Sequence, residues 1–500
     1  MRTFSKSKLI ALRQCPKRLW LELHQPQLQT HTLQTQAGFA VGNEVGEIAR
    51  QIYDPLGKGS LIDIKKDGFE NAFQRSTDLL QKNLPIFEAG FSSAGGLAFV
   101  DVMLPVVEDG ALLWRMIEVK ASASIKDTYR DDIAIQAYVA QSAGVALKSV
   151  SIAHIDSKWT YQGDRNYQGL LKETDLTNEV FSRSDEVKVW IKEAQTIAAL
   201  KETPAIKTGL HCNTPYACGF YDYCSINIPK PEYPISWLPR FSSSKKYQLE
   251  NEDIYDLRDV PEHMLNFKQM LVKEYTLNDK VYFDEMGAAA CFENLTYPAY
   301  FLDFETISFA IPIWKGTRPY QQITFQFSLH IVDESGYLTH TEFLDLTGDN
   351  PSESFAKALI NACGTKGPVF VYSSSFEMSR ICELAYRLPS LSSHLLAIND
   401  RVVDLLPIAR DHYYHPSQEG SWSIKKVLSA VVPDLRYDDL EGVQNGMMAM
   451  NAYLEVIHVN TTVERKEQIR EQLLKYCKLD TYAMVRLWQV FANLNTIEND

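Results

Sequence analysis

The sequence predicts an α/β protein with two domains or more. Its 500 residues exceed what a single hydrophobic core usually supports. Short apolar segments that end in acidic residues alternate with segments of helical periodicity, and a proline-rich stretch at residues 229–234 separates the two halves. Hydrophobic residues make up 45% of the chain and charged residues 23%, as is typical of soluble globular proteins.

The net charge and the lengths of the apolar segments further restrict the type of protein and its expected location in the cell. The formal charge of −13 argues against a general nucleic-acid binder, although a nuclease can carry a local basic surface and a positive metal ion. No apolar run reaches the length of a membrane span, and residues 1–8 lead into a polar helix, so we expect a cytoplasmic protein with no membrane partner. In that reducing compartment the eight cysteines are expected to be thiols or metal ligands. The sequence does not indicate the oligomeric state.

The first predicted helix covers residues 5–23 and contains a break. Ser5 or Ser7 is a suitable N-cap, and apolar residues recur at roughly helical spacing. Pro16 must end or restart the helix, because proline lacks the backbone N–H. Cys15 stands directly before this break, which is an unusual position for a cysteine that serves only in packing.

Two apolar strands are predicted on either side of a Glu-Asp-Gly turn at residues 108–110. Asp101 lies on the first strand, and the second ends in Glu118 and Lys120, which share one face while Val119 points into the core. Such a set suits phosphodiester hydrolysis, with the acids holding a metal that activates water and the lysine stabilising developing charge. The alternative is a surface ion pair between glutamate and lysine.

Two flanking helices complete this pattern. Residues 38–52 form an amphipathic helix with Glu44 and Glu47 on one face, and a helix after the second strand carries polar residues three to four positions apart. The ordered set resembles the RecB-like branch of the PD-(D/E)XK nucleases. That resemblance implies a restriction-endonuclease-like domain. It also implies that Glu44 is the metal ligand of the first helix, with Glu47 as second choice. The alternative is that these two acids form a solvent-exposed face of the helix. The resemblance further implies a metal site of Asp101, Glu118 and Val119, the catalytic residue Lys120, and the supporting residues Tyr129 and Gln136 around Asp132.

Four cysteines extend the resemblance. Cys212, Cys218 and Cys224 follow the spacing C-x5-C-x5-C, and Cys15 lies far upstream. This layout resembles the iron–sulfur RecB-like nucleases, which implies a [4Fe-4S] cluster that joins the two ends of the domain. Such a link removes chain entropy from the unfolded state. Zinc is the alternative ligand for four thiolates, and buried thiols without a metal are the third interpretation.

The second half begins with a predicted buried strand at residues 300–304. Asp303 and Glu305 lie two residues apart at its end and therefore project from the same face. Two adjacent carboxylates repel each other unless a positive group lies between them, and Mg²⁺ or Mn²⁺ prefers such oxygen ligands. The alternative is a strand that ends in solvent-facing acids.

Further acids follow in an order that suits completion of this site. Glu377 begins a helix after an apolar strand and a small polar turn, Asp404 follows a short apolar run, and Tyr476 and Asp480 lie four residues apart on one helix. This order resembles the DnaQ-like DEDD exonucleases, which have an RNase H-like fold. The resemblance implies metal ligands Asp303, Glu305, Glu377 and Asp480, a water-positioning Tyr476 and a structural Asp404; Glu377 stands where aspartate is usual.

The complete chain resembles a bacterial family of unknown function in which a RecB-like domain precedes a DnaQ-like domain. The resemblance implies a RecB-like domain at residues 1–228, a mostly helical connector at 229–296 and a DnaQ-like 3′–5′ exonuclease domain at 297–500. The expected activity is metal-dependent hydrolysis of phosphodiester bonds at nucleic-acid ends, with single-stranded or end-containing DNA as the first candidate and RNA as the second. The alternatives are a nucleic-acid-binding or assembly protein with degenerate sites, and a metal-dependent nucleotide hydrolase.

Overall fold

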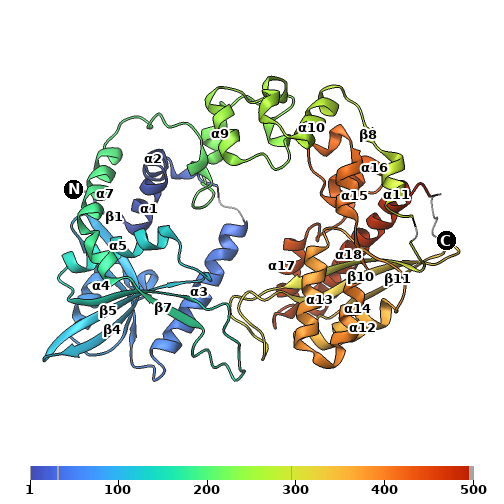
Figure 1. The fold of residues 1–500 in the computed structure, drawn as a ribbon. Helices are drawn as coiled ribbons and strands as arrows, with labels where there is room; N and C mark the ends of the chain where they lie inside the picture. Colours follow the sequence, from blue (N-terminus) through green and yellow to red (C-terminus); the bar gives the residue numbers. More distant parts are fainter. Residues whose placement is uncertain (1, 31–32, 294, 495–500) are drawn as a thin grey trace. The chain divides into compact units, whose positions relative to one another are not determined.

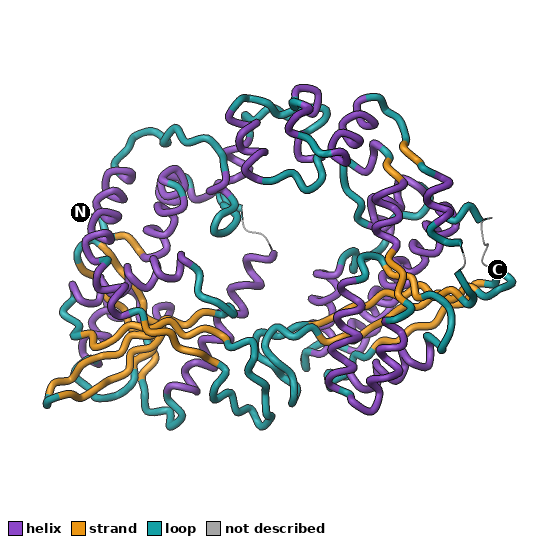
Figure 2. Tube along the Cα trace, in the orientation of Figure 1, coloured by secondary structure: helices purple, strands orange, loops and turns teal. Residues whose placement is uncertain are grey.

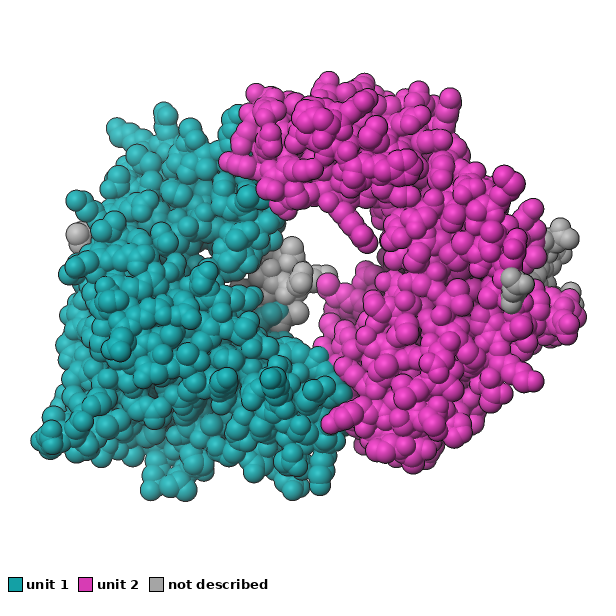
Figure 3. Space-filling view, viewed as in Figure 1, with its two compact units in different colours: residues 1–228, 309–321 teal, residues 229–308, 322–500 magenta. Residues whose placement is uncertain are grey.

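The chain forms two compact units of mixed α/β structure (Figures 1 and 3). The computed structural model describes residues 2–30, 33–293 and 295–494. The first unit comprises residues 1–228 and 309–321, and the second comprises residues 229–308 and 322–500. Residues 229–296, expected as a separate connector, therefore belong to the same unit as the C-terminal sheet. Residue 294 of that segment lies outside the described residues.

The first unit contains a seven-stranded sheet in the order β2-β3-β4-β5-β6-β7, with β1 paired to β4. Its strands are β1 (Phe4–Ser5), β2 (Ser60–Leu61), β3 (Ile86–Ser93), β4 (Gly96–Glu108), β5 (Ala111–Lys120), β6 (Leu147–Ile155) and β7 (Leu171–Asp175). Its helices are α1 (Lys6–Gln14), α2 (Pro16–His24), α3 (Leu33–Tyr53), α4 (Ile64–Leu79), α5 (Asp127–Ser142), α6 (Thr177–Ser182), α7 (Ser184–Ala198) and α8 (Tyr221–Ser225).

Local sequence signals account for several of these boundaries. The hydroxyl of Ser5 accepts a hydrogen bond from the backbone N–H of Lys8 and caps α1. Cys15 is extended, and Pro16 occupies the first position of α2, which confirms the predicted break. The predicted hairpin between β4 and β5 is also confirmed, with positive φ angles of 50° at Asp109 and 78° at Gly110.

The two faces of this sheet are covered by different helices (Figure 1). On one face, apolar side chains of β4 and β5 share a core with α1, α2, α4, α5 and α7. On the other face, Val45 of α3 and Val119 of β5 belong to a separate cluster that also includes Ala310 and Ile311. Because side chains alternate along a strand, Glu118 and Lys120 face the first group of helices, and Val119 faces α3.

The second unit contains a five-stranded mixed sheet in the order β11-β10-β9-β12-β13 (Figure 2). Its strands are β8 (Tyr282–Phe283), β9 (Ala299–Ile307), β10 (Ile323–Val332), β11 (Leu338–Leu344), β12 (Val369–Val371), β13 (Val402–Asp404) and β14 (Tyr413–Tyr414), of which β8 and β14 form a separate pair. Its helices are α9 (Ser243–Asn251), α10 (Phe267–Leu277), α11 (Glu285–Ala290), α12 (Ser352–Ala362), α13 (Ser375–Arg387), α14 (Ser392–Asn399), α15 (Leu405–His412), α16 (Ile424–Val431), α17 (Gly446–Ile457) and α18 (Val463–Phe491).

Central strand β9 separates an apolar face from the face that carries its acids. Leu302 and Phe304 pack in a core with residues of α12, α13 and α14. On the opposite face Phe301 contacts Trp488 of α18, with ring centroids 5.3 Å apart. Alternation then directs Asp303 and Glu305 to the α18 side of the sheet.

Candidate functional site

The C-terminal candidate site lies where β9 faces α18. Tyr476 and Asp480 are both buried and lie one helical turn apart on α18. One carboxylate oxygen each from Asp303, Glu305 and Asp480 can be chosen so that all three lie within 4.8 Å of one another. Two residues of one strand and one residue 175 positions further along the chain are thus brought together.

Burial and mutual repulsion dominate the electrostatics of this acidic triad. Burial, followed by the charges of Asp480, Glu305 and Glu377, raises the pKa of Asp303 well above its ordinary value. Burial and Asp480 raise the pKa of Glu305 to about 8, against an opposing effect of Lys425. Burial likewise raises the pKa of Asp480 to about 6. Three carboxylates in this arrangement need additional positive charge in order to ionise together near neutral pH.

Tyr437 and Lys425 lie close to the triad, although neither was predicted from the sequence to be a site residue. The hydroxyl of Tyr437 donates a hydrogen bond of 2.6 Å to Oδ1 of Asp480. The ammonium group of Lys425 lies 4.7 Å from the ring centroid of Tyr437 and 5.4 Å from that of Tyr476. Neither residue has a spacing relation to the acids, so no local pattern could have identified them.

Glu377 lies on α13, which follows β12, and Asp404 is the last residue of β13, which pairs with β12. Glu377 is in the first turn of α13 and is 3% exposed, and burial raises its pKa to about 7. Its Oε2 has no hydrogen-bond partner among the described residues. It is not part of the group within 4.8 Å, although its charge affects Asp303. Glu377, the expected fourth ligand, is therefore near the triad but outside it.

Asp404 instead organises the turn that precedes Glu377. Its carboxylate accepts hydrogen bonds of 2.9 Å from the backbone N–H groups of Ser373, Ser374 and Leu406. Ser373 adopts a positive φ of 74°, so this turn is held in a conformation that a serine rarely adopts. Asp404 therefore fixes the start of α13 and caps α15.

The donor set of the triad fits a hard divalent cation. All three ligating groups are carboxylates, the type of donor that Mg²⁺ and Mn²⁺ prefer, and their raised pKa values indicate unbalanced negative charge. The unpartnered oxygen of Glu377 adds a further acceptor nearby.

The N-terminal candidate site surrounds Glu118 at the end of β5. Oε1 of Glu118 accepts hydrogen bonds from Lys120 at 2.6 Å and from Lys6 at 2.9 Å, and Oε2 accepts one from Gln136 at 2.7 Å. Asp101 accepts a hydrogen bond of 2.6 Å from the backbone N–H of Val119. Both oxygens of the central glutamate are therefore already engaged by this chain's own donors.

Asp132 and Tyr129 of α5 complete the surroundings of Lys120. Lys120 forms a 2.5 Å ion pair with Asp132 and lies 5.1 Å from the ring centroid of Tyr129. Although burial acts in the opposite direction, the charges of Lys6 and Lys120 lower the pKa of Asp132. Burial and the charge of Glu118 raise the pKa of Asp101 well above its ordinary value.

Lys6 and Glu88 belong to this site but were not predicted. Lys6 follows β1, whose parallel pairing with β4 brings the start of the chain to the sheet. Glu88 has a positive φ of 56°. The pairing of β3 with β4 is interrupted at this point, so that Phe87 pairs with Val102 and Ala89 with Val100, while Glu88 and Asp101 are left out of the register. Burial and Glu118 raise the pKa of Glu88. Sequence spacing offers no signal for either residue, because both come from other strands or helices.

The structure does not bring Glu44 and Glu47 to Glu118. Both acids are exposed on α3. Helix α3 packs on the face of Val119, which is the face opposite to Glu118 and Lys120. Burial and Glu47 raise the pKa of Glu44, and its charge acts on Tyr167.

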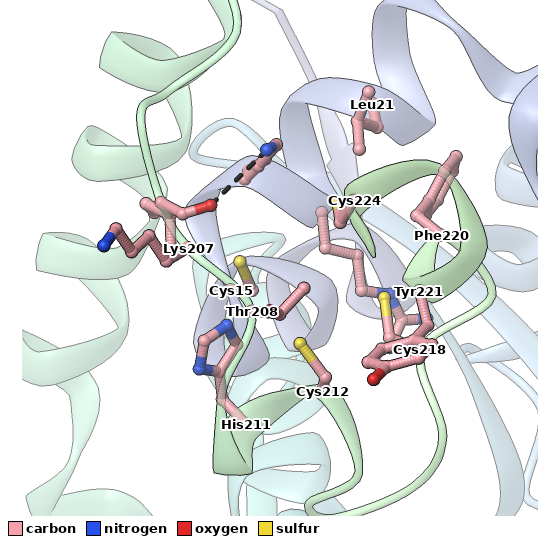
Figure 4. A pocket seen from close by; sticks show the side chains of 13 residues that line it. Cys15, Leu21, Lys207, Thr208, His211, Cys212, Cys218, Phe220, Tyr221 and Cys224 are labelled. Carbon is pink, nitrogen blue, oxygen red and sulfur yellow. Dashed lines mark hydrogen bonds between the residues drawn. The ribbon is translucent and has the colours of Figure 1, made fainter. Parts of the chain in front are cut away.

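The four predicted cysteines line one cavity (Figure 4). Cys15 comes from the break between α1 and α2, whereas Cys212, Cys218 and Cys224 come from the end of the segment 1–228. The cavity that they line together with other residues has a volume of about 20 Å³, and all eight cysteines are free thiols. Burial raises the pKa of Cys212 and Cys224, and the neighbouring thiols add to this effect. Sulfur donors are the ligand type that iron–sulfur clusters and zinc take, but among the described residues the group of potential metal ligands within 4.8 Å of one another is the acidic triad and contains no cysteine.

A protein-family model matches part of the chain. The model of a domain of unknown function (DUF2779) matches residues 300–423. The matched segment contains Asp303, Glu305, Glu377 and Asp404 but ends before Asp480. No curated protein shows a significant match to the chain. Within the residues that the structure describes, no helix is both long and apolar enough to cross a membrane.

Proposed function

We propose that this protein is a metal-dependent nuclease whose principal active site is the acidic triad of Asp303, Glu305 and Asp480. The observation that carries the proposal is the convergence of three carboxylates, two of them buried and that of Asp303 partly exposed, whose pKa values are all raised. Carboxylates that share a buried site are common where a divalent cation binds. The mixed sheet and the order of the acids along the chain support an RNase H-like, DnaQ-like exonuclease.

The residues around the triad have distinct roles in this proposal. Asp303, Glu305 and Asp480 would hold Mg²⁺ or Mn²⁺, which when bound activates water and stabilises the leaving 3′ oxygen. Tyr437 fixes the orientation of Asp480 by its hydrogen bond. Lys425 adds positive charge at the site, and Tyr476 is available to position water.

The N-terminal site supports a second interpretation for the first unit. Its set of acids and Lys120 is compatible with a PD-(D/E)XK nuclease, and the cysteine cavity is compatible with a [4Fe-4S] cluster or zinc. Against catalysis, Lys6, Lys120 and Gln136 engage both oxygens of Glu118. This observation favours a first unit that binds nucleic acid or assembles with it, while the second unit cleaves.

The test is degradation of end-labelled single- and double-stranded DNA and RNA with Mg²⁺ or Mn²⁺. In a Lys120→Ala background, Asp303→Asn should reduce cleavage by about 10²-fold or more, because it removes a principal charge without changing shape. Asp349→Asn, at an exposed aspartate of the same unit, is the matched control. Parental cleavage by the Asp303→Asn variant would contradict the proposal and favour a binding or assembly role.

A further inference from the structure

The second unit contains a cleft whose lining residues the proposed chemistry does not use. The cleft has a volume of about 720 Å³, which is within the range of ligand sites in proteins. Arg240, Asn266 and Lys268, from the segment before the sheet, form one part of its lining. Residues that follow β12, residues of α15 and the chain that leads into α16 form the other part. We call it the basic cleft.

Positive charge dominates the lining of the basic cleft. Arg240, Lys268 and Arg410 all line it, and no aspartate or glutamate is among the lining residues described. This composition contrasts with the formal charge of −13 for the complete chain. Asp411 lies close by and offsets part of the charge, through contacts of 2.9 Å with Arg410 and 3.7 Å with Lys268.

Arg240 supplies positive charge that nothing in the described part of the chain neutralises. It is exposed, adopts a positive φ of 49°, and forms no hydrogen bond or ion pair with the described residues. Lys268 is half-buried, donates a hydrogen bond of 2.7 Å to the carbonyl oxygen of Arg410, and lies 5.6 Å from the ring centroid of Trp422. One cation is therefore free to bind an anion, and two others are fixed in place.

Two helix N-termini add to the positive potential of the cleft. Asn266 is the N-cap of α10, and Ser423 is the N-cap of α16. The side chain of Ser423 makes no capping hydrogen bond, so it leaves the first-turn N–H groups of α16 without that acceptor. The partial positive charge at such helix ends favours anions.

Two chain segments link the lining of the basic cleft to residues of the candidate active site. Ser373 in its wall is held by Asp404, and the same turn leads to Glu377. Ile424 in its wall is followed by Lys425, whose charge lowers the pKa of Glu305 and Asp480. A ligand in the cleft would thus contact segments that also position side chains around the triad.

We propose that the basic cleft binds backbone phosphates of a single-stranded nucleic acid whose end lies at the triad. This inference rests on the proposed nuclease function and assigns a substrate-binding role to residues 229–296. Cationic side chains suit phosphodiester groups, and their contacts are independent of base sequence. Arg240 has no competing acid among the described residues, whereas Arg410 and Lys268 share Asp411. The volume of the basic cleft lies within the range of sites that hold small ligands, so the cleft can take a short part of one strand.

The experiment measures binding of fluorescently labelled single-stranded DNA and RNA oligonucleotides to the full chain. It uses the Asp303→Asn background without divalent ions, so that binding is separated from cleavage. Arg240→Gln is the central variant because this side chain is exposed and has no described partner, so its loss should not affect folding. Lys268→Gln is the second variant. Lys357→Gln, at an exposed lysine of α12, is the matched control.

We expect Arg240→Gln to weaken binding about three- to tenfold at low salt and the double variant to weaken it further. Each lost phosphate contact should reduce the slope of log K against log salt by about 0.7. The control should change neither quantity. An unchanged salt slope in Arg240→Gln, or no binding of single strands by the parent, would overturn the inference. Competition by a nucleoside monophosphate as strong as that by an oligonucleotide would also overturn it, because the cleft would then bind a free nucleotide.

The two proposals fail in different ways. If the wild-type protein degrades nucleic acid but the basic-cleft variants bind normally, the nuclease proposal stands and the cleft assignment is wrong. If single strands bind through the cleft and no substrate is cleaved, the cleft binds nucleic acid but the nuclease proposal is wrong.

Discussion

Replacing Glu305 by glutamine should stabilise the metal-free second unit at pH 8. Glu305 is 7% exposed, and burial together with Asp480 raises its pKa from an ordinary value of 4.5 to about 8. Between these two values the unfolded chain releases its proton before the folded chain does. The raised pKa therefore lowers stability progressively as pH rises through this window, and its full effect is reached above about pH 8.

The size of this effect follows from the pKa shift. One pKa unit corresponds to 1.36 kcal/mol, so the shift of Glu305 amounts to up to about 5 kcal/mol at pH 8 and almost nothing near pH 4. Glutamine retains the shape but carries no ionisable proton, so it escapes this penalty. For a unit of this size we expect the midpoint of thermal unfolding to rise by roughly 10 °C at pH 8.

The assay is differential scanning calorimetry of wild type and Glu305→Gln with EDTA at pH 5 and pH 8. Glu342→Gln, at an exposed glutamate of β11, is the control and should show no pH-dependent gain. Addition of Mn²⁺ should stabilise the wild type by about 2.7 kcal/mol at a hundredfold excess over its dissociation constant, and the variant much less. If Glu305→Gln lowers the midpoint equally at both pH values, repulsion within the triad is refuted.

Three further predictions concern other parts of the chain. If the cysteine cavity holds an iron–sulfur cluster, purified protein should be brown and contain iron, and Cys212→Ser should eliminate both; if it holds zinc, Cys212→Ser should eliminate the zinc, as measured by absorbance and metal analysis. Lys6→Gln should destabilise the first unit by about 2–4 kcal/mol, because it removes one of the two lysines that neutralise the buried acids Glu118 and Asp132, whereas Lys148→Gln at an exposed pair should have little effect; chemical denaturation compares the two. Asp404→Asn should destabilise the second unit by about 2–3 kcal/mol through weaker bonds to three N–H groups, with Asp400→Asn as an exposed control in the same measurement.

Much of the local structure could be predicted because its causes are local. Pro16 interrupts the first helix wherever the chain folds, and the turn at residues 108–110 favours a hairpin irrespective of its surroundings. Alternation along β9 places Asp303 and Glu305 on one face, and helical spacing aligns Tyr476 with Asp480. These relations need only the period of the element.

The missed residues have long-range causes. Lys6 reaches Glu118 only because β1 pairs with β4, and Tyr437 reaches Asp480 from a segment without a recognisable motif. The position of Glu44 shows the same limit: its spacing suits a ligand, but the face of the sheet on which α3 packs is decided by the apolar side chains around Val45.

The sequence by itself determined the α/β class, the elements that carry the acids and the grouping of the cysteines along the chain. Only the tertiary structure decided which acids converge, which carboxylates are satisfied by lysines and which segment forms the basic cleft. The physical reason is the range of the interactions. Backbone geometry and proline act over a few residues, whereas convergence depends on strand pairing and on the packing of apolar faces, which join residues far apart in the chain.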